Sequence, residues 1–202
     1  MNTFYVVNSN ANGENIPYFF EMTWKPNLPI FDLHAESPES KKFADTYRVK
    51  AKTDDLKVDL LINDYLASDD FLKMCSSMNT DYLSVPIKVF LDDGSEPAKR
   101  YNFFCVKIRL WALNQDKSVY QFADEGLLRS QEERGCGPVY ERIDSFVFKD
   151  EVVEDLFYCE EIKQVICSSK FKAEFELRQF SGLNFIAIDG SYVYAPWDDF
   201  LS

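Results

Sequence analysis

Few residues in this sequence have the chemistry of a catalytic nucleophile or base. The one histidine, His34, lies in a proline-containing stretch between Pro29 and Pro38. A Ser-His-acid or Cys-His system would have to use this histidine, and no nucleophile-elbow pattern surrounds it. We therefore interpret His34 as a solvated loop residue rather than as a catalytic base.

Cys136 is the thiol whose neighbours come closest to those of a ligand site. It lies in the segment Gly135-Cys136-Gly137-Pro138, where the two glycines let the backbone approach a ligand closely. A turn explains the same residues, and no base lies near in sequence to lower the pKa of the thiol. We favour a loop cysteine and keep an enzyme with a Cys136-based site as an alternative.

Motifs for metals and cofactors are missing from the sequence. The seven glycines are too scattered for a phosphate loop or a dinucleotide fingerprint, and no cysteine or histidine pair has zinc spacing. The calcium-loop pattern is missing as well. With 34 acidic residues, no spacing selects one pair, so a carboxylate-based enzyme also stays an alternative. The sequence predicts no metal and no cofactor.

Acidic doublets recur along the chain and are its most distinctive feature. Many of them fit turns or helix starts on a soluble surface, and a subset can form a negative patch that steers a basic protein into contact. Trp24 and Trp197 are candidate anchors of such a contact, although core packing explains either one equally well. We predict that the partner binds the acids of the irregular loop after residue 123 and of the segment 150–155: Asp124, Glu125, Glu132, Glu133, Asp150, Glu151, Glu154 and Asp155.

The overall charge narrows the class of partner. The chain of 202 residues has 22 Lys and Arg against 34 Asp and Glu, a formal charge of −12. Phosphate would repel such a chain unless it carried a local basic patch, and its basic residues occur singly or in short runs such as Lys41-Lys42. The sequence therefore predicts neither a nucleic-acid partner nor a membrane partner, and it favours a basic protein.

Hydrophobic periodicity predicts an α+β fold with a mainly antiparallel sheet and two or more short helices packed on it. Strict alternation over 83–91 and 104–110 predicts two antiparallel strands, and Pro86 predicts an edge position or a bulge for the first. We expect helices at 68–78 and after Ser168 or Ser169, each with a serine cap. Further strands are expected at 3–7, 18–24, 56–60, 143–148 and 184–188, and a long loop or junction at 114–138.

The chain is expected to form one α+β domain over residues 1–202, with an N-terminal part at 1–80 and a C-terminal part at 139–202. We find no internal repeat in the sequence. Five widely spaced cysteines, an odd number, predict reduced thiols, and the first residues lack the basic region of a secretory signal. Both features favour a cytoplasmic protein.

Three segments in the last third of the chain carry a resemblance to a known family. They are Leu156-Phe157-Tyr158-Cys159, then Val165-Ile166-Cys167-Ser168-Ser169-Lys170-Phe171-Lys172, then Phe180-Ser181-Gly182-Leu183-Asn184-Phe185. This order of a short segment, a strand, a serine-capped helix and a closing strand resembles immunity proteins of bacterial polymorphic-toxin systems, chiefly the family numbered eleven and its relative numbered forty-three. The first eighty residues carry no part of the resemblance.

The resemblance implies a cytoplasmic α+β protein that binds and neutralises a toxin encoded beside it, without catalysis of its own. A toxin that acts on nucleic acid tends to be basic, so the partner we expect is a nuclease or another basic toxin domain. A secretion adaptor or chaperone for an effector is the other alternative. The quoted residues are packing and capping residues, so the resemblance does not say which residues touch the toxin.

Overall fold

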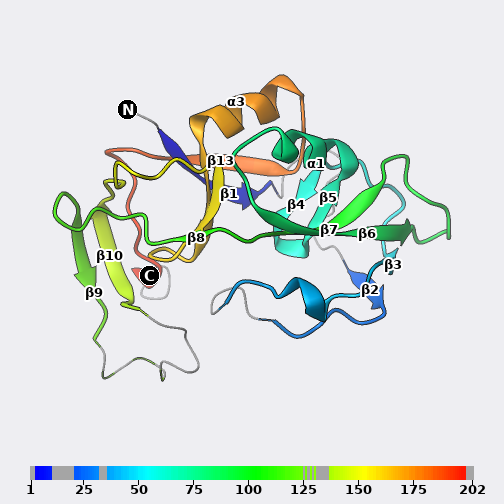
Figure 1. Cartoon of the computed structure of the whole chain (residues 1–202), viewed down its shortest axis with the longest axis horizontal. Coiled ribbons are helices and arrows are strands. Elements are labelled where there is room, and N and C mark those ends of the chain that lie inside the picture. Colours follow the sequence, from blue (N-terminus) through cyan, green and yellow to red (C-terminus); the bar gives the residue numbers. More distant parts are fainter. Residues whose placement is uncertain are drawn as a thin grey trace.

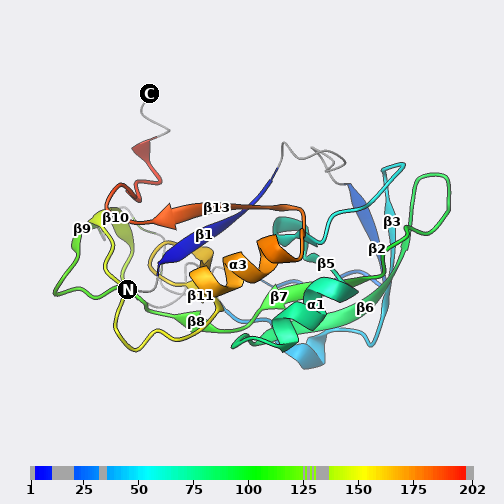
Figure 2. The same ribbon diagram turned by 90° about the horizontal axis from the view of Figure 1, so that it is seen from above.

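The computed structural model describes residues 3–10, 21–31, 36–124, 126, 128, 130 and 137–198. These residues form a six-stranded sheet, a five-stranded sheet and a two-stranded hairpin, with helices α1 (Asp69–Ser76) and α3 (Ser169–Leu177) on one side (Figures 1 and 2). His34 and Cys136 lie outside the described residues. Strands dominate, in agreement with an α+β chain built mainly from antiparallel pairs. Neither helix has the length or apolarity needed to cross a bilayer.

The six-stranded sheet occupies one end of the molecule. Its strands, in spatial order, are β2 (Met22–Lys25), β3 (Tyr47–Ala51), β6 (Tyr82–Phe90), β7 (Tyr101–Val106), β5 (Leu66–Ser68) and β4 (Leu60–Leu61). The pair β3–β6 is parallel and the other pairs are antiparallel. Two short 3-10 turns lie between strands of this sheet in sequence: η1 (Ser40–Lys42) between β2 and β3, and η2 (Ile62–Asp64) between β4 and β5.

The five-stranded sheet brings the two ends of the chain together. Its order is β13 (Leu183–Ile188), β1 (Phe4–Ser9), β12 (Gln164–Ser168), β11 (Leu156–Cys159) and β8 (Arg109–Leu110), and the pair β8–β11 is its one parallel pair. The hairpin of β9 (Val119–Phe122) and β10 (Tyr140–Ser145) packs below this sheet (Figure 1). The predicted strands at both ends of the chain are thus confirmed.

The predicted serine caps are confirmed at both helices. The Ser68 and Ser168 hydroxyls each accept the backbone N–H three residues later, at 3.1 Å. The apolar faces of the helices meet, since the ring of Phe71 lies 6.1 Å from that of Phe171. One buried core formed by both helices, β1 and β7 therefore joins the two sheets.

An internal repeat that the sequence analysis missed relates the two sheets. The order β6-β7-β5-β4 in one sheet matches β13-β1-β12-β11 in the other, with antiparallel neighbours throughout. In each half a hairpin leads into a serine-capped helix and then a long strand. The repeat is hidden in sequence for two reasons. β7 comes directly after β6, whereas its counterpart β1 comes at the N-terminus, far in sequence from β13. The hairpins β4–β5 and β11–β12 also differ in length.

Two buried aspartates occupy equivalent positions in this repeat. Asp59 accepts a hydrogen bond from the Ser68 hydroxyl at 3.0 Å, and Asp155 accepts one from the Ser168 hydroxyl at 2.7 Å. Each carboxylate also accepts a backbone N–H from beyond the helix of the other half: Ser181 N–H to Asp59 and Asn79 N–H to Asp155, both at 3.1 Å. These reciprocal bonds hold the two halves together.

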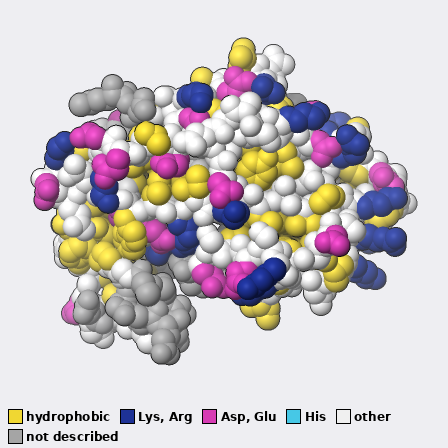
Figure 3. Space-filling model, viewed as in Figure 1, with side chains coloured by type: hydrophobic (Ala, Val, Ile, Leu, Met, Phe, Trp, Pro, Cys, Tyr) yellow, Lys and Arg dark blue, Asp and Glu magenta, His cyan; other side chains and the backbone are white. Residues whose placement is uncertain are grey.

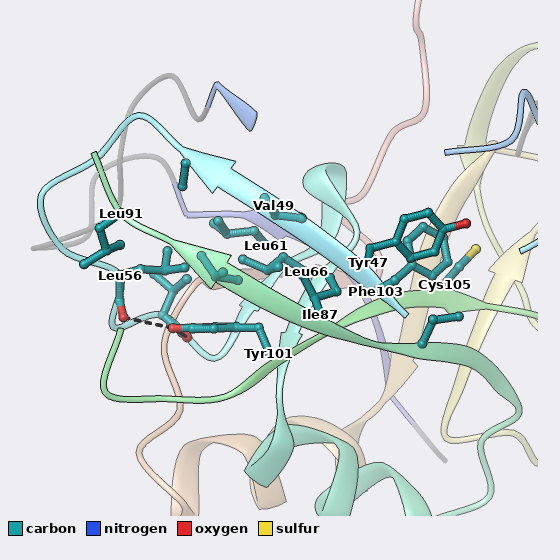
Figure 4. Close-up of a cluster of buried hydrophobic side chains, with 14 of the residues drawn as sticks. Tyr47, Val49, Leu56, Leu61, Leu66, Ile87, Leu91, Tyr101, Phe103 and Cys105 are labelled. Carbon is teal, nitrogen blue, oxygen red and sulfur yellow. Dashed lines mark hydrogen bonds between the residues drawn. The ribbon is translucent and has the colours of Figure 1, made fainter. Parts of the chain in front are cut away.

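The core of the six-stranded sheet explains one error in the predicted elements. Leu56, Val58 and Leu60 are buried, as their alternation indicates, but residues 56–58 are not a strand. The Tyr101 hydroxyl lies 3.0 Å from the Leu56 carbonyl oxygen and 2.9 Å from that of Val58 (Figure 4). Buried backbone carbonyl groups need hydrogen-bond partners. The Tyr101 hydroxyl supplies a donor to these two carbonyl groups in place of a neighbouring strand.

Two further expectations need correction. β6 lies inside its sheet, between β3 and β7, rather than at an edge. Pro86 is tolerated there because pairing with β3 begins one residue later, at Ile87. The predicted loop at 114–138 contains strand β9, whose four residues have too short an alternation to be read from the sequence.

Candidate partner-binding surface

A pocket of about 510 Å³ opens between the two sheets, and it is the natural place to look for an enzyme's active site. Its described lining includes the aromatic residues Phe31, Tyr65, Phe104 and Tyr158 with the cations Arg109 and Lys163, and it contains no carboxylate and no histidine. General acid–base chemistry needs such groups within reach of a substrate. The pocket therefore gives no support to the carboxylate-based enzyme.

The charges beside this pocket neutralise one another. Arg109 lies 2.6 Å from the Glu160 carboxylate and stacks on the Tyr158 ring, and Lys163 lies 2.9 Å from the same carboxylate. Burial raises the pKa of Glu160, but hydrogen bonds from Arg109 and Lys163 outweigh it, so the pKa is lowered from its ordinary value. Glu160 is thus a permanently charged anchor rather than a proton carrier near neutral pH.

The four described cysteines are buried structural thiols. Burial raises the pKa of Cys105 to about 12 and raises those of Cys75, Cys159 and Cys167 as well. Cys159 donates a hydrogen bond to the buried Glu161 carboxylate at 3.1 Å. Because the thiolate is the reactive form, these four side chains are inert in the folded protein.

This assignment predicts the outcome of thiol titration. In a Cys136→Ser variant at mildly alkaline pH, the folded protein is expected to give no rapid reaction with Ellman's reagent, since none of the remaining thiols is accessible or ionised. After unfolding in urea, Cys75, Cys105, Cys159 and Cys167 should all react. A thiol that reacts within the dead time without denaturant would contradict the burial described here.

The end of the molecule away from the six-stranded sheet is called here the hairpin end. It consists of β9, β10 and residues 110–118, 123–124, 146–151 and 191–198. The Glu161 carboxylate fastens it to the five-stranded sheet by accepting the backbone N–H groups of Ala112 at 3.1 Å and Leu113 at 2.8 Å. Ile143 of β10 exchanges two backbone hydrogen bonds with Tyr194. The backbone N–H of Ala123 donates to Val139 at 2.9 Å, so the ends of the loop between them lie side by side.

Exposed apolar side chains concentrate at the hairpin end. Among the described residues, the three large aromatic side chains that are substantially exposed all lie here: Trp111 at 37%, Phe122 at 45% and Trp197 at 50%. Val119 and Val193 are exposed beside them. Trp and other large aromatic side chains dominate binding energy in protein interfaces, whereas single exposed aliphatic residues need no explanation. Figure 3 shows apolar side chains gathered on this end, next to acidic ones.

The hairpin end is also acidic. Its described cations are Lys117, Arg142 and Lys149, and its described acids are Asp116, Asp124, Glu141, Asp144, Asp150, Glu151 and Asp198. Arg142 pairs with Asp144 at 2.6 Å and with Asp198 at 2.8 Å, so its charge is already offset. A partner would therefore meet aromatic side chains inside a rim of net negative charge.

The eight acids predicted to bind a partner fall into three groups. Asp124, Asp150 and Glu151 are exposed at the hairpin end, and Asp150 lies 3.5 Å from Lys117. Glu125, Glu132 and Glu133 lie outside the described residues. Glu154 is half-buried, and its carboxylate accepts the Val153 N–H. Asp155 is buried, and it accepts hydrogen bonds from the helix-capping Ser168 and from the Asn79 N–H, so it serves the fold and we leave it out of the contact surface.

The aromatic residues of this surface were missed in the sequence, with one exception. Trp197 is exposed as the anchor hypothesis requires, whereas Trp24 packs against Tyr47 and Phe103 in a core cluster. Trp111 and Phe122 had no signal of their own, because Phe and Trp side chains are highly buried on average. Gly137 was a clue: a Cβ there would lie 2.3 Å from the Trp111 ring, so the chain passes directly against that indole.

No cluster of three or more potential metal-binding side chains occurs in the part of the chain that the structure describes. A comparison with curated proteins found no match. The model of one protein family, the Imm11 immunity protein family, matches residues 15–190. This match includes the C-terminal segments that carry the resemblance seen in the sequence, and it covers every strand of the repeat except β1. The chain belongs to the Imm11 immunity protein family.

Proposed function

We propose that this protein binds a cognate toxin encoded beside it and neutralises the toxin without catalysis, and that it does so in the cytoplasm. The observation that carries the proposal, beyond family membership, is the concentration of exposed aromatic side chains inside an acidic rim at the hairpin end. Aromatic anchors supply binding energy, and complementary charge raises the association rate. A basic toxin domain, such as a nuclease, has the chemistry that fits this surface.

The proposed contact residues are Phe122 and Trp197 as anchors with Asp124, Asp150 and Glu151 as the rim. We include Glu125, Glu132 and Glu133, whose positions in the loop between Ala123 and Val139 place them next to this surface in sequence. To protect a cell at low copy number the complex should be nanomolar or tighter, about −12 kcal/mol. A standard interface of this strength needs only a few strong anchors.

Reversing the rim charges tests the electrostatic part of the proposal. We expect Asp124→Lys with Asp150→Lys to slow association with the product of the neighbouring gene about tenfold at low salt, because the long-range attraction is lost. Trp197→Ala and Phe122→Ala should each weaken the binding free energy by about 2 kcal/mol, roughly a thirtyfold higher dissociation constant, through loss of buried contact area. Surface plasmon resonance at two salt concentrations separates the two effects.

Matched controls lie on other surfaces. Asp54→Lys with Glu36→Lys makes the same charge change at exposed positions outside the hairpin end. Leu177→Ala removes an apolar side chain that is 77% exposed, also outside the hairpin end. If the control variants lost as much affinity as the hairpin variants, the toxin would not bind the hairpin end. Absence of any complex with neighbouring gene products would remove the proposed function itself.

The adaptor alternative is separated by a toxicity assay. An immunity protein should restore growth to cells that express the toxin, whereas an adaptor would bind an effector and leave it active. Loss of protection in the Trp197→Ala variant, with the folded protein still present at normal levels, would connect protection to the hairpin end. Consumption of a substrate by the purified chain alone would instead favour an enzyme.

A further inference from the structure

The strands of the six-stranded sheet carry charge of one sign. Every charged residue within these six strands is a cation: Lys25 in β2, Arg48 and Lys50 in β3, and Lys88 in β6. The whole chain has 34 acidic residues against 22 basic ones. An all-basic sheet surface is therefore the opposite of what the overall composition leads one to expect.

Three of these cations stand directly opposite one another. In the strand register Lys25 pairs with Arg48, and Arg48 pairs with Lys88. Neighbouring strands are about 4.8 Å apart, so these side chains, which we call the basic row, form a short line across the strands. All three are exposed, on the face opposite the core cluster that contains Val49 and Ile87. Like charges directly opposite in a sheet are destabilising, so folding alone does not favour this arrangement.

Acidic neighbours offset this charge only in part. Lys88 lies 2.9 Å from Glu96, and Lys50 lies 3.7 Å from Asp92. Among the described residues, neither Lys25 nor Arg48 has a carboxylate within ion-pairing distance. The row thus keeps two exposed positive charges that the described protein does not neutralise.

A groove continues from the basic row toward helix α1. It has a volume of about 370 Å³, and its lining includes the cations Lys88, Lys99 and Arg100 and the acids Asp69 and Glu96. Lys99 pairs with Asp59 at 2.7 Å and Arg100 pairs with Asp69 at 2.8 Å, so the charges of the groove itself are largely offset. Helix α1 lies over β7 and part of β6, whereas β3 and β2 extend beyond it without a helix above them (Figure 2). Dark blue side chains gather at this end of the space-filling view (Figure 3). The row and the groove therefore form one open surface at the opposite end from the hairpin. Its uncompensated positive charge is that of Lys25 and Arg48 in the row.

We propose that the basic row and its groove bind an acidic segment of a partner polypeptide, at a second surface separate from the hairpin end. Carboxylates fit because the planar guanidinium of Arg48 offers a fork that matches a carboxylate, and flanking lysines add point charges. A nucleic acid fits less well, since its continuous phosphates would also meet Asp92, Asp93 and Glu96 at the rim, whereas a peptide can place neutral residues there and direct its carboxylates to the row. Topology brings together cations that the sequence scatters, which is why the sequence indicated no basic patch.

The test uses a fluorescent synthetic peptide of alternating glutamate and serine and does not depend on the toxin. The wild-type protein is expected to bind the peptide at low ionic strength, with binding lost near 1 M salt, where the screening length falls to about 3 Å. Lys25→Gln with Arg48→Gln should weaken binding about tenfold, the combined effect of two exposed charge pairs. Fluorescence anisotropy measures peptide binding by the wild type at each salt concentration and by the variant. Thermal unfolding verifies that the variant is folded.

The matched control is Lys41→Gln with Lys57→Gln, which removes two exposed cations outside the sheet and should leave binding unchanged. Carbodiimide coupling of the peptide should join its carboxylates to Lys25, Lys50 or Lys88, as identified by mass spectrometry. Equal binding by the row variant and the control variant would overturn the proposal. Tighter binding of a single-stranded oligonucleotide of the same length, lost in the row variant, would replace the acidic polypeptide by nucleic acid.

Discussion

Replacing Gly182 by alanine is expected to lower the free energy of unfolding by about 3–5 kcal/mol. Gly182 has φ +109°, a conformation that residues with a side chain rarely adopt, and a Cβ there would lie 2.0 Å from the Leu60 carbonyl oxygen. The atom that must move is backbone, so no side-chain rotation relieves the contact. Gly182 lies where the chain leaves α3, crosses β4 of the other half and enters β13.

Urea denaturation measures this loss, and Gly190→Ala is the control. No atom lies within 4 Å of a Cβ built at Gly190, so alanine there should change the free energy of unfolding by less than about 0.5 kcal/mol. The same segment also carries hydrogen bonds between the halves, from the Asp59 and Leu60 N–H groups to the Ser181 carbonyl oxygen. Similar midpoints for the two variants would mean that the chain passes Leu60 less closely than described.

Replacing Asp155 by alanine is expected to destabilise the protein by about 3 kcal/mol. Its carboxylate accepts hydrogen bonds from the Ser168 hydroxyl, from the Lys170 ammonium at 2.8 Å and from the Asn79 N–H. The substitution leaves the buried Ser168 hydroxyl and the Asn79 N–H without this acceptor. Asp150→Ala, at a side chain that is 91% exposed, is the control and should have little effect in the same urea titration.

The pH dependence of Asp155 gives an independent measurement. Burial raises the pKa of its carboxyl, but hydrogen bonds from Lys170, Ser168 and Asn79 outweigh burial and leave the pKa lowered from its ordinary value. A lowered pKa means that the folded state prefers the charged form. The stabilisation is therefore complete above the pKa of the unfolded chain, about 3.9, and is lost as pH falls through the folded value.

The stability difference between the wild type and Asp155→Asn should accordingly stay constant near neutral pH and shrink in acid, below about pH 4. Asparagine does not titrate, so the variant lacks this contribution at every pH. A difference that stayed the same down to the acid unfolding transition would contradict a charged, hydrogen-bonded Asp155. Such a result would leave the proposed toxin contact untouched, because Asp155 is not part of that surface.

The two proposed surfaces lie at opposite ends of the molecule and can be altered separately. Substitutions at Trp197 change the hairpin end and leave the basic row intact, and substitutions at Arg48 do the reverse. Energies of changes so far apart and without shared contacts should add. Single and double variants would therefore show whether one partner spans both surfaces, since only then would both substitutions lower the affinity for the same partner.

The sequence alone determined the secondary structure of several short segments. The serine caps of both helices, the alternation of β6 and the last strand after Gly182 depend on residues within a few positions of each other, and all are confirmed. The family could also be identified from C-terminal segments, because packing and capping residues recur in a fixed local order. Such features follow from backbone preference and side-chain periodicity, which act over one turn or a few residues of strand.

Only the tertiary structure decided which distant residues meet. Lys25, Arg48 and Lys88 form one row because β2, β3 and β6 are neighbours, and three aromatic side chains stay exposed because the hairpin end has no further layer above it among the described residues. Asp59 and Asp155 look like other surface acids in sequence, yet they join the two halves of a repeat. Strand pairing and burial are set by contacts between segments far apart in the chain, and these leave no periodic trace near any one of the residues involved.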